Sequence, residues 1–258
     1  MEKITSVQNP KVKAAQKLWK RRERDKQGLF IIEGYRELSR ATVEIETLFI
    51  CEELFLGANE HTLIKKIGAP VFCLNEKVFR SLSYRDRPDG LIAIAKQRHF
   101  GLESLEKKKN PFYVVAQAIE KPGNLGTIMR CADGCGVDAV IVCDACTDIY
   151  NPNVVRASVG TLFTQKVVEA TSEQTLAWLQ KRGVAIVAAT PHAKQSYRDT
   201  DLKGPIAIAF GTEQYGLSDL WMQQANLQVK IPMRGVADSL NVAMATAILL
   251  YEAAGQRF

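Results

Sequence analysis

Three glycine-containing loops carry the side chains that could do chemistry in this chain of 258 residues. Their sequences are PGNLG at 122–126, GTEQYGL at 211–217 and PMRGVADSLN at 232–241. Glycine lets the backbone approach a ligand closely, and polar side chains in or just after each loop could bind or orient that ligand. Taken singly, each of these side chains is better explained as a helix cap or a surface group. The polar residues are Asn124, Arg130, Glu213, Ser239 and Asn241.

Each loop follows a predicted strand and precedes a predicted helix. The strands are expected at Phe112–Ala118, Ile206–Phe210 and Leu227–Ile231. In an open parallel sheet, the loops at the carboxyl ends of the strands converge on the ligand crevice. The chain has no GxxxxGKS or GxxxxGKT motif, and its glycines at 123, 126, 134 and 136 do not form GxGxxG. Phosphate-binding NTPases and NAD enzymes are therefore disfavoured.

The third loop leads into a nearly all-apolar helix, predicted over residues 240–250. A helix that is apolar on every face is hidden from water. At about ten residues it is too short to span a bilayer, which needs about 20. We therefore expect it in a protein core or at a subunit interface, with Asp238 or Ser239 as its N-cap and Gly255 as its stop.

The rest of the pattern predicts an α/β protein with two domains. Residues 1–97 form a small α/β domain, residues 98–110 a polar linker that contains ESLEKKKN, and residues 111–258 the second domain. In the second domain, Ser172 is expected to cap a helix over 173–181. The front domain should have strands at 30–32, 47–50, 71–73 and 91–95 and helices at 35–42, 60–67 and 76–82.

The net charge of +6 is unevenly distributed along the chain. Residues 1–110 hold 22 Lys and Arg against 15 Asp and Glu, which gives +7, whereas residues 111–258 hold 12 against 13, which gives −1. Two explanations account for this asymmetry about equally well. The front domain could contact a polyanion such as nucleic acid, or its helices could simply be solvated surface helices.

Residues 5–26 carry much of this positive charge and are predicted to form one basic amphipathic helix. Val12, Ala15, Leu18 and Trp19 recur at helical spacing and would form its apolar face. Basic side chains occupy most of the remaining positions. The candidate phosphate contacts among them are Lys11, Lys13, Lys20, Arg21, Arg22 and Arg24.

The cysteines and the N-terminal residues indicate no metal site, membrane segment or export signal. Cys143 and Cys146 form a lone CxxC without a second CxxC or nearby paired histidines, so buried or loop thiols are favoured over zinc or redox chemistry. No apolar signal region follows Met1, and no apolar run is long enough to span a membrane. The expectation is a cytoplasmic protein without a metal.

Three segments of the second domain carry a family resemblance. PGNLGTIMRCADGCGVDAV, AFGTEQYGLSDLW and IPMRGVADSLNVAMATAILLYE resemble, in order and spacing, the three motifs of the SpoU (TrmH) family of RNA 2'-O-ribose methyltransferases. This resemblance covers roughly residues 111–255. In the front domain, GLFIIEGYREL and DGLIAIA look like the substrate-binding domain of the family's ribosomal-RNA branch, which is similar to ribosomal protein L30e.

The resemblance implies a SPOUT fold, in which the C-terminal segment passes through a loop to make a deep trefoil knot in a mostly parallel sheet. It also implies S-adenosylmethionine as cofactor, a homodimer, and methyl transfer to a ribose 2'-hydroxyl of 23S-type ribosomal RNA. Cofactor contacts would come from Gly211, Ile231, Leu240 and Thr190. The catalytic set would be Asn124, Arg130, Glu213, Ser239 and Asn241.

Two alternatives remain open at this point: a transfer-RNA 2'-O-methyltransferase of the same family, and a catalytically silent RNA-binding or assembly protein on the same fold. The chain also departs from the family pattern in two places. Lys121 stands before the proline where many members have an acid, although Glu120 precedes it. Asp89-Gly90 replaces the more usual Gln-Gly of the front domain, so the RNA specificity could differ.

Overall fold

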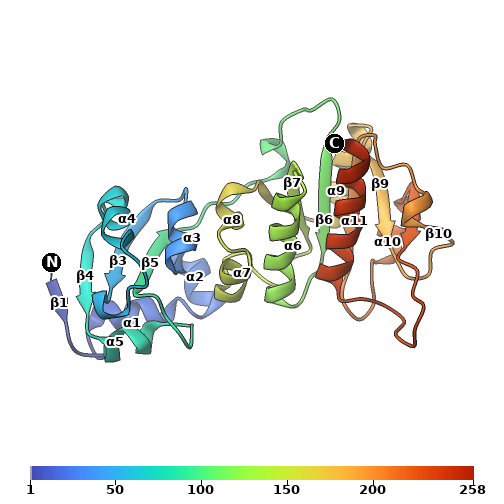
Figure 1. Ribbon diagram of the computed structural model, residues 1–258. Helices are drawn as coiled ribbons and strands as arrows, with labels where there is room; N and C mark the ends of the chain where they lie inside the picture. Colours follow the sequence, from blue (N-terminus) through green and yellow to red (C-terminus); the bar gives the residue numbers. More distant parts are fainter. Residues whose placement is uncertain (1) are drawn as a thin grey trace. The chain divides into compact units, whose positions relative to one another are not determined.

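Alternating strands and helices fold into two α/β units in the computed structural model, which describes residues 2–258 (Figure 1). The front unit contains the chain up to Arg98 together with Asp148–Thr164. The back unit contains His99–Thr147 and Gln165–Phe258. The chain thus enters the front unit twice. No helix within residues 2–258 is long and apolar enough to cross a membrane.

The front unit is built on a five-stranded sheet with the strand order β1-β4-β3-β5-β2. β5 pairs antiparallel with β2 and β3, whereas β4 pairs parallel with β1 and β3. Five consecutive residues of β5 are buried, which fits a strand with neighbours on both sides. The strands are β1 (Glu2–Ile4), β2 (Leu29–Glu33), β3 (Ile45–Ile50), β4 (Val71–Leu74) and β5 (Leu91–Lys96).

The helices of the front unit pack around this sheet, and two of them match the predicted bounds. These two are α4 (Glu60–Ile67), which ends at Gly68 with a φ of 69°, and α5 (Glu76–Leu82). The others are α1 (Pro10–Lys17), α2 (Arg21–Gln27), α3 (Tyr35–Arg40), α7 (Pro152–Ala157) and α8 (Thr161–Thr164), with a short 3₁₀ turn η1 at Glu52–Leu54.

The single basic helix predicted over residues 5–26 is wrong, because the structure has two helices there. The last bonds of α1 are of the i→i−3 kind: the amides of Leu18, Trp19 and Lys20 donate to the carbonyls three residues earlier. Lys20 is then extended, with φ −92° and ψ 130°, and starts α2. The break leaves Trp19 36% exposed instead of on a continuous apolar stripe.

Arg24 is not a phosphate contact, which corrects its predicted role. Its side chain is only 1% exposed, and Nη2 forms a 2.7 Å ion pair with Oδ2 of Asp148. Nη1 donates to the carbonyls of Leu18 at 2.8 Å and Trp19 at 2.9 Å. Arg24 therefore supports the chain break between α1 and α2. The other candidates, Lys11, Lys13, Lys20, Arg21 and Arg22, are exposed.

Residues 148–164 pack with the front unit, although they lie inside the segment 111–258 that the sequence suggested as the second domain. The ring of Phe30 lies 4.3 Å from that of Tyr150 and 6.1 Å from that of Phe163, measured between centroids. Arg40 donates to the carbonyl of Val159 at 2.7 Å. These contacts join residues more than a hundred positions apart, so local sequence patterns carry no sign of them.

The back unit confirms the predicted parallel sheet, with seven strands in the order β10-β12-β9-β11-β6-β7-β8 and every pairing parallel. The central strands β6, β7 and β11 are buried along their whole length. The strands are β6 (Phe112–Gln117), β7 (Ala139–Cys143), β8 (Val167–Ala170), β9 (Ala185–Ala189), β10 (Gln195–Ser196), β11 (Ile206–Phe210) and β12 (Leu227–Lys230).

Two helices of the back unit, α6 and α11, lie side by side against the sheet (Figure 1). Leu102 and Leu105, in the predicted polar linker, belong to the apolar core of this unit. The helices are α6 (Pro122–Gly134), α9 (Ser172–Lys181), α10 (Asp219–Gln224) and α11 (Val242–Arg257), with 3₁₀ turns η2 at Leu102–Ser104 and η3 at Tyr197–Asp199.

Three predicted helix ends are wrong. Thr171, not Ser172, caps α9, through a capping box with Gln174. Asn241, rather than Asp238 or Ser239, caps α11, because its side chain accepts a hydrogen bond from the amide of Ala243 at 3.0 Å. α11 also continues past Gly255, which takes a helical conformation inside the last turn.

The last helix has an exposed face in the single chain, so its expected place at a subunit interface stays a prediction. Met244 is 64% exposed and Tyr251 60% exposed on α11, whereas Leu249 and Leu250 are buried. One face of the helix packs in the core, and large apolar side chains remain on its surface.

Replacing Arg24 with Ala should destabilise the protein by about 3–5 kcal/mol, because it leaves a carboxylate and two carbonyls without their charged partner. Urea denaturation followed by circular dichroism measures this change. Arg22→Ala on the same helix is the matched control and should change stability by no more than about 0.5 kcal/mol, because Arg22 is exposed. Equal stability of the two variants would show that the buried pair contributes nothing.

Candidate functional site

The three glycine-containing segments follow β6, β11 and β12 at the carboxyl ends of these strands, as the strand order predicts. The second and third are loops, but PGNLG is not a loop as predicted, because residues 122–126 form the start of α6. Neighbouring parallel strands all end at the same edge of the sheet, so side chains from distant parts of the chain meet there. Thr190, Gly211 and Ile231 are each the first residue after a strand, following β9, β11 and β12. These three cofactor candidates therefore share one edge of three adjacent strands.

Asn124, in the first turn of α6, lies at the centre of the site and joins this helix to the two loops after β11 and β12. Its Nδ2 donates to Oε1 of Glu213 at 2.5 Å. Its Oδ1 accepts a hydrogen bond from Nδ2 of Asn241 at 3.2 Å. Asn241 in turn accepts from the amide of Ala243 and caps α11. The structure thus connects three of the five predicted catalytic residues in one hydrogen-bonded chain.

Glu213 has a second carboxylate oxygen with no protein partner. Oε2 is buried, and no group within residues 2–258 forms a hydrogen bond with it. A buried acceptor without a donor destabilises the folded state by about 1–3 kcal/mol. Such an atom at the sheet edge is suited to accept a hydrogen bond from a ligand hydroxyl or amino group.

The loop after β11 is tightly closed and requires glycine at its start. A Cβ atom on Gly211 would lie 2.1 Å from the carbonyl carbon and oxygen of Gly216 and 2.2 Å from the amide nitrogen of Leu217. The amides and carbonyls of Thr212 and Gly216 pair across the loop at 2.9 and 3.0 Å. The loop is therefore closed by its own backbone and leaves no room for a side chain at position 211.

The remaining candidates lie around this chain without joining it. Thr190 donates its amide to the carbonyl of Val229 at 3.0 Å, which ties the end of β9 to β12. Ile231 is half-buried and Leu240 is 39% exposed. Ser239 is exposed and donates to Oδ1 of Asp238 at 2.9 Å.

Arg130 is exposed on α6, and within residues 2–258 no hydrogen bond or ion pair links it to Asn124 or Glu213. Six residues separate it from Asn124 on the same helix. That separation corresponds to about 9 Å along the axis and about 240° around it. Its guanidinium therefore faces solvent on a different side of α6 from Asn124.

Sequence reasoning missed the pair that holds the first and second of the three segments in place. Gln117, the last residue of β6, donates through Nε2 to Oγ of Ser218 at 2.8 Å. Its Oε1 accepts from the amide of Ser218 at 2.9 Å. Gln117 is only 6% exposed. A polar amide at the end of an otherwise apolar strand is the signal that could have revealed it.

The cysteines lie outside this chemistry. Burial raises the pKa of the Cys143 thiol to about 12, whereas Cys146 lies in an exposed loop. Among residues 2–258 no group of three or more His, Cys, Asp or Glu side chains is arranged to hold a metal ion.

Both the N-terminal and the C-terminal segments of the chain match models of known protein families. Residues 111–251 match the family model described as the SpoU rRNA Methylase family, and residues 9–93 match the MRM3-like substrate binding domain. The chain is 28% identical over 258 residues to the 23S rRNA (guanosine(2553)-2'-O)-methyltransferase RlmP of Bacillus subtilis (strain 168), with 99% of this chain and 100% of that protein covered.

Solved structures agree with these matches over nearly the full length. An RNA 2'-O ribose methyltransferase has 39% identity and a TM-score of 0.89, with 98% of each chain covered. An AdoMet-bound rRNA methyltransferase from Sinorhizobium meliloti has 32% identity and a TM-score of 0.89, with 98% of this chain and 97% of that chain covered.

Replacing Gly211 with Ala should destabilise the protein by about 1–3 kcal/mol, because the loop backbone must move to admit the methyl group. Gly123→Ala is the matched control, since a Cβ there meets nothing within 4 Å and the residue is helical. That control should be neutral or slightly stabilising. Thermal unfolding of both variants measures the difference, and equal melting temperatures would contradict the close packing at Gly211.

Proposed function

The chain belongs to the SpoU rRNA Methylase family, and we propose that its site transfers a methyl group from S-adenosylmethionine to a ribose 2'-hydroxyl of ribosomal RNA. The observation that carries the proposal is the hydrogen-bonded chain from Asn241 through Asn124 to Glu213. It brings together one side chain from each family motif at the ligand edge of a parallel sheet.

S-adenosylmethionine would be held at the edge formed by Thr190, Gly211 and Ile231, with Leu240 beside them. The closed loop at Gly211 supports this placement, because it fixes the backbone at the end of β11 and has no room for a side chain at position 211. The bound sulfonium supplies an electrophilic methyl group, so the reaction requires no metal ion. The carboxylate of Glu213 adds a negative charge that favours a cationic ligand.

The ribose hydroxyl is a poor nucleophile and must lose its proton as it attacks the methyl group. In our proposal Oε2 of Glu213 accepts a hydrogen bond from this hydroxyl and orients it. Asn124 fixes Glu213 through Oε1 and is itself fixed by Asn241. Ser239 shapes the loop at the start of α11.

Arg130 is proposed to grip the RNA phosphate next to the reacting ribose. A guanidinium remains protonated in proteins, so it is a poor proton acceptor but a good partner for phosphate and for a developing alkoxide. The proton would leave through the phosphate or water. The exposed position of Arg130 on α6 suits contact with a bound RNA.

RNA capture is proposed for the front unit, whose residues 9–93 match a substrate-binding domain. Exposed basic side chains at the start of the chain would contact phosphates without base specificity. The enzyme would act in the cytoplasm, where it meets ribosomal RNA. The proposed phosphate contacts are Lys11, Lys13, Lys20, Arg21 and Arg22.

The proposal includes a homodimer with α11 at its interface. Exposed apolar side chains on this helix, Met244 and Tyr251, support it, as does Leu240 just before the helix. We also propose the deep trefoil knot of the SPOUT fold. The chain crosses β9 on its way from β11 to β12 and then returns as α11 to pack against β11, which supports such a threading.

The function is tested by transfer of tritium from labelled S-adenosylmethionine to total RNA, followed by mapping of ribose methylation in cells with and without the gene. Loss of one methyl group from ribosomal RNA in the gene-deleted cells is the expected result. Loss of a transfer-RNA methyl group would favour the transfer-RNA alternative. Binding of RNA without any methyl transfer would identify a catalytically silent protein.

Replacing Arg130 with Ala should lower the rate of methyl transfer by at least about 100-fold, because a charged group that stabilises the transition state is lost. Binding of S-adenosylmethionine, measured by calorimetry, should stay nearly unchanged. Loss of cofactor binding in this variant would mean that Arg130 belongs to the cofactor site instead. Arg130→Lys keeps the positive charge, so it serves as the matched variant and should retain part of the activity.

RNA affinity should fall with salt by about 0.7–0.9 log units per log unit of salt for each phosphate neutralised. The double variant Lys20→Ala and Arg22→Ala should therefore reduce the slope by roughly 1.4–1.8. Lys65→Ala with Lys66→Ala is the matched control, because both lysines are exposed on α4. Filter binding over a salt series measures the slopes, and a wild-type affinity that does not depend on salt would contradict the assignment.

A further inference from the structure

A tyrosine ring is exposed to solvent in the same loop that carries Glu213. Tyr215 is 78% exposed and lies two residues after Glu213, in the loop between β11 and α10. Its side chain makes no hydrogen bond and no ring contact with any group in residues 2–258. The ring is therefore available to a ligand bound at this loop.

The backbone that carries this ring is held in place. The amide of Tyr215 donates to Oγ1 of Thr212 at 2.9 Å, and Gly216 follows with a φ of 70°. The pairing of Thr212 with Gly216 closes the loop, and the two hydrogen bonds between Gln117 and Ser218 fix its far end. Because a tyrosine side chain has few torsions, ordering the ring against a ligand costs little conformational entropy.

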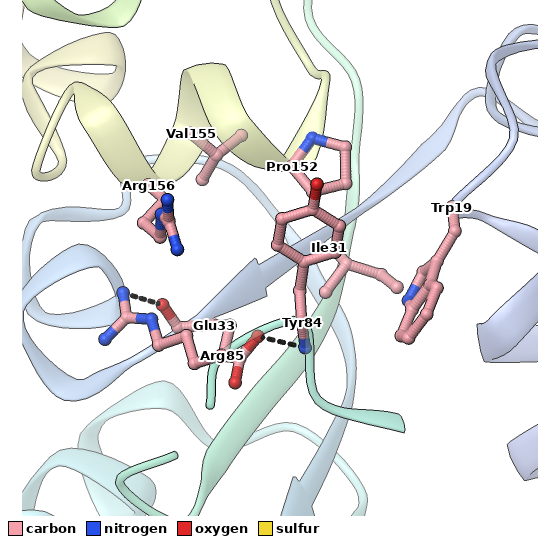
Figure 2. A pocket seen from close by; sticks show the side chains of 8 residues that line it. All are labelled: Trp19, Ile31, Glu33, Tyr84, Arg85, Pro152, Val155 and Arg156. Atoms are coloured by element: carbon pink, nitrogen blue, oxygen red, sulfur yellow. Dashed lines mark hydrogen bonds between the residues drawn. The ribbon is translucent and has the colours of Figure 1, made fainter. Parts of the chain in front are cut away.

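The partly exposed aromatic rings of the front unit differ from Tyr215, because their own unit holds them (Figure 2). Trp19 and Tyr84 pack edge to face with centroids 5.9 Å apart, and the Tyr84 hydroxyl accepts a hydrogen bond from Nδ2 of Asn153 at 2.7 Å. The hollow beside them has room for about one water molecule. Both carboxylate oxygens of Glu33 at this hollow already accept hydrogen bonds. These rings therefore serve the packing of the front unit.

The neighbouring carboxylate indicates which ligand would meet Tyr215. Oε1 of Glu213 accepts from Asn124, whereas Oε2 is buried without a partner in residues 2–258 and can accept from a hydroxyl. In a ribonucleotide the 2'-hydroxyl and the base are attached to adjacent carbons of the ribose. The Cα atoms of Glu213 and Tyr215 are at most about 7 Å apart, because two residues of an extended chain span no more. One nucleotide can therefore contact both side chains.

We propose that the ring of Tyr215 stacks on the base of the nucleotide whose ribose is methylated. The proposal rests on the proposed function, because it takes RNA as the substrate and Glu213 as the acceptor for the ribose hydroxyl. Proteins commonly stack splayed-out RNA bases on aromatic side chains. Such stacking tolerates every base, because each base has a π-face. Tyr215 therefore holds the target nucleotide beside Glu213 without selecting the identity of its base.

Methylation of ribosomal RNA from cells that lack the gene tests this role in the full chain. Tyr215→Ala should lower kcat/KM for the RNA by about 5- to 140-fold, which is ~1–3 kcal/mol per stacked base at 1.4 kcal/mol per tenfold. Tyr215→Phe and Tyr215→Trp keep a stacking ring and should stay within about 3-fold of the wild type. Binding of S-adenosylmethionine, measured by calorimetry, should be unchanged in all three variants.

Gln214→Ala is the matched control, because this neighbour in the loop is also exposed. It should leave kcat/KM for the RNA unchanged. Wild-type kcat/KM in Tyr215→Ala would overturn the proposal. A Tyr215→Phe variant as slow as Tyr215→Ala would overturn it too, because the hydroxyl and not the ring would then be required.

Fluorescence reads the stacking without methyl transfer. Tyr215→Trp places an indole at the proposed contact, and stacking on a base quenches indole fluorescence. Ribosomal RNA should therefore quench Tyr215→Trp more than the wild type, whose three tryptophans are present in both proteins. Heparin, a polyanion without bases, should cause no such difference. No additional quenching by RNA, or equal additional quenching by heparin, would overturn the stacking.

The two proposals fail in different ways. A wild-type chain that transfers no methyl group to any RNA would refute the proposed function, whereas RNA-specific quenching of Tyr215→Trp would still place a base on this residue. Methyl transfer by the wild type with unchanged activity in Tyr215→Ala would refute only the stacking. Weaker self-association of Tyr215→Ala in sedimentation, with unchanged kcat/KM for the RNA, would assign the ring to a contact between two copies of the chain instead.

Discussion

The two hydrogen bonds of Asn124 join loops that lie 89 and 117 residues away along the chain. One amide side chain donates to Glu213 and accepts from Asn241, so its orientation is set by both partners. Because Asn241 also caps α11, the same chain fixes the start of the last helix. Loss of this connection would leave the three segments without a common geometry, and the orphaned oxygen of Glu213 would no longer have a defined direction.

The sheet of the back unit makes this connection possible. Its parallel central strands are buried along their whole length, and their carboxyl ends share one edge. Gln117 and Ser218 exchange two hydrogen bonds just behind the loops, and the turn at Gly211 closes with no space for a side chain. A rigid edge suits a ligand bound in one conformation, and α11 carries exposed apolar side chains at Met244 and Tyr251.

The basic side chains at the start of the front unit have two different roles. Arg24 is buried with Asp148 and holds two carbonyls at the break between α1 and α2, whereas its neighbours remain in solvent. That break also turns Trp19 outward, next to Tyr84 and the buried acceptor Glu33. One structural ion pair therefore supports the chain break that leaves Trp19 partly exposed.

The sequence by itself determined the features that depend on neighbouring residues. Apolar periodicity and a following glycine were enough to place α4, and the order of strands, loops and helices predicted the parallel sheet of the back unit. The three motif segments can also be found in the sequence, and their resemblance to the motifs of the SpoU (TrmH) family points to the family. Local patterns succeed in these places because the forces behind them act within a few residues.

Only the tertiary structure decided the features that depend on distant partners. In the sequence, Arg24 cannot be distinguished from the other basic residues of its segment. In the structure it is buried because it pairs with Asp148, which lies 124 residues away along the chain. Residues 148–164 joined the front unit through aromatic packing against Phe30, and Asn241 replaced Ser239 as the cap of α11. The pairing of Asn124 with Glu213 and the separate position of Arg130 likewise emerged only from the fold, since a hydrogen bond between loops leaves no periodic trace in the sequence.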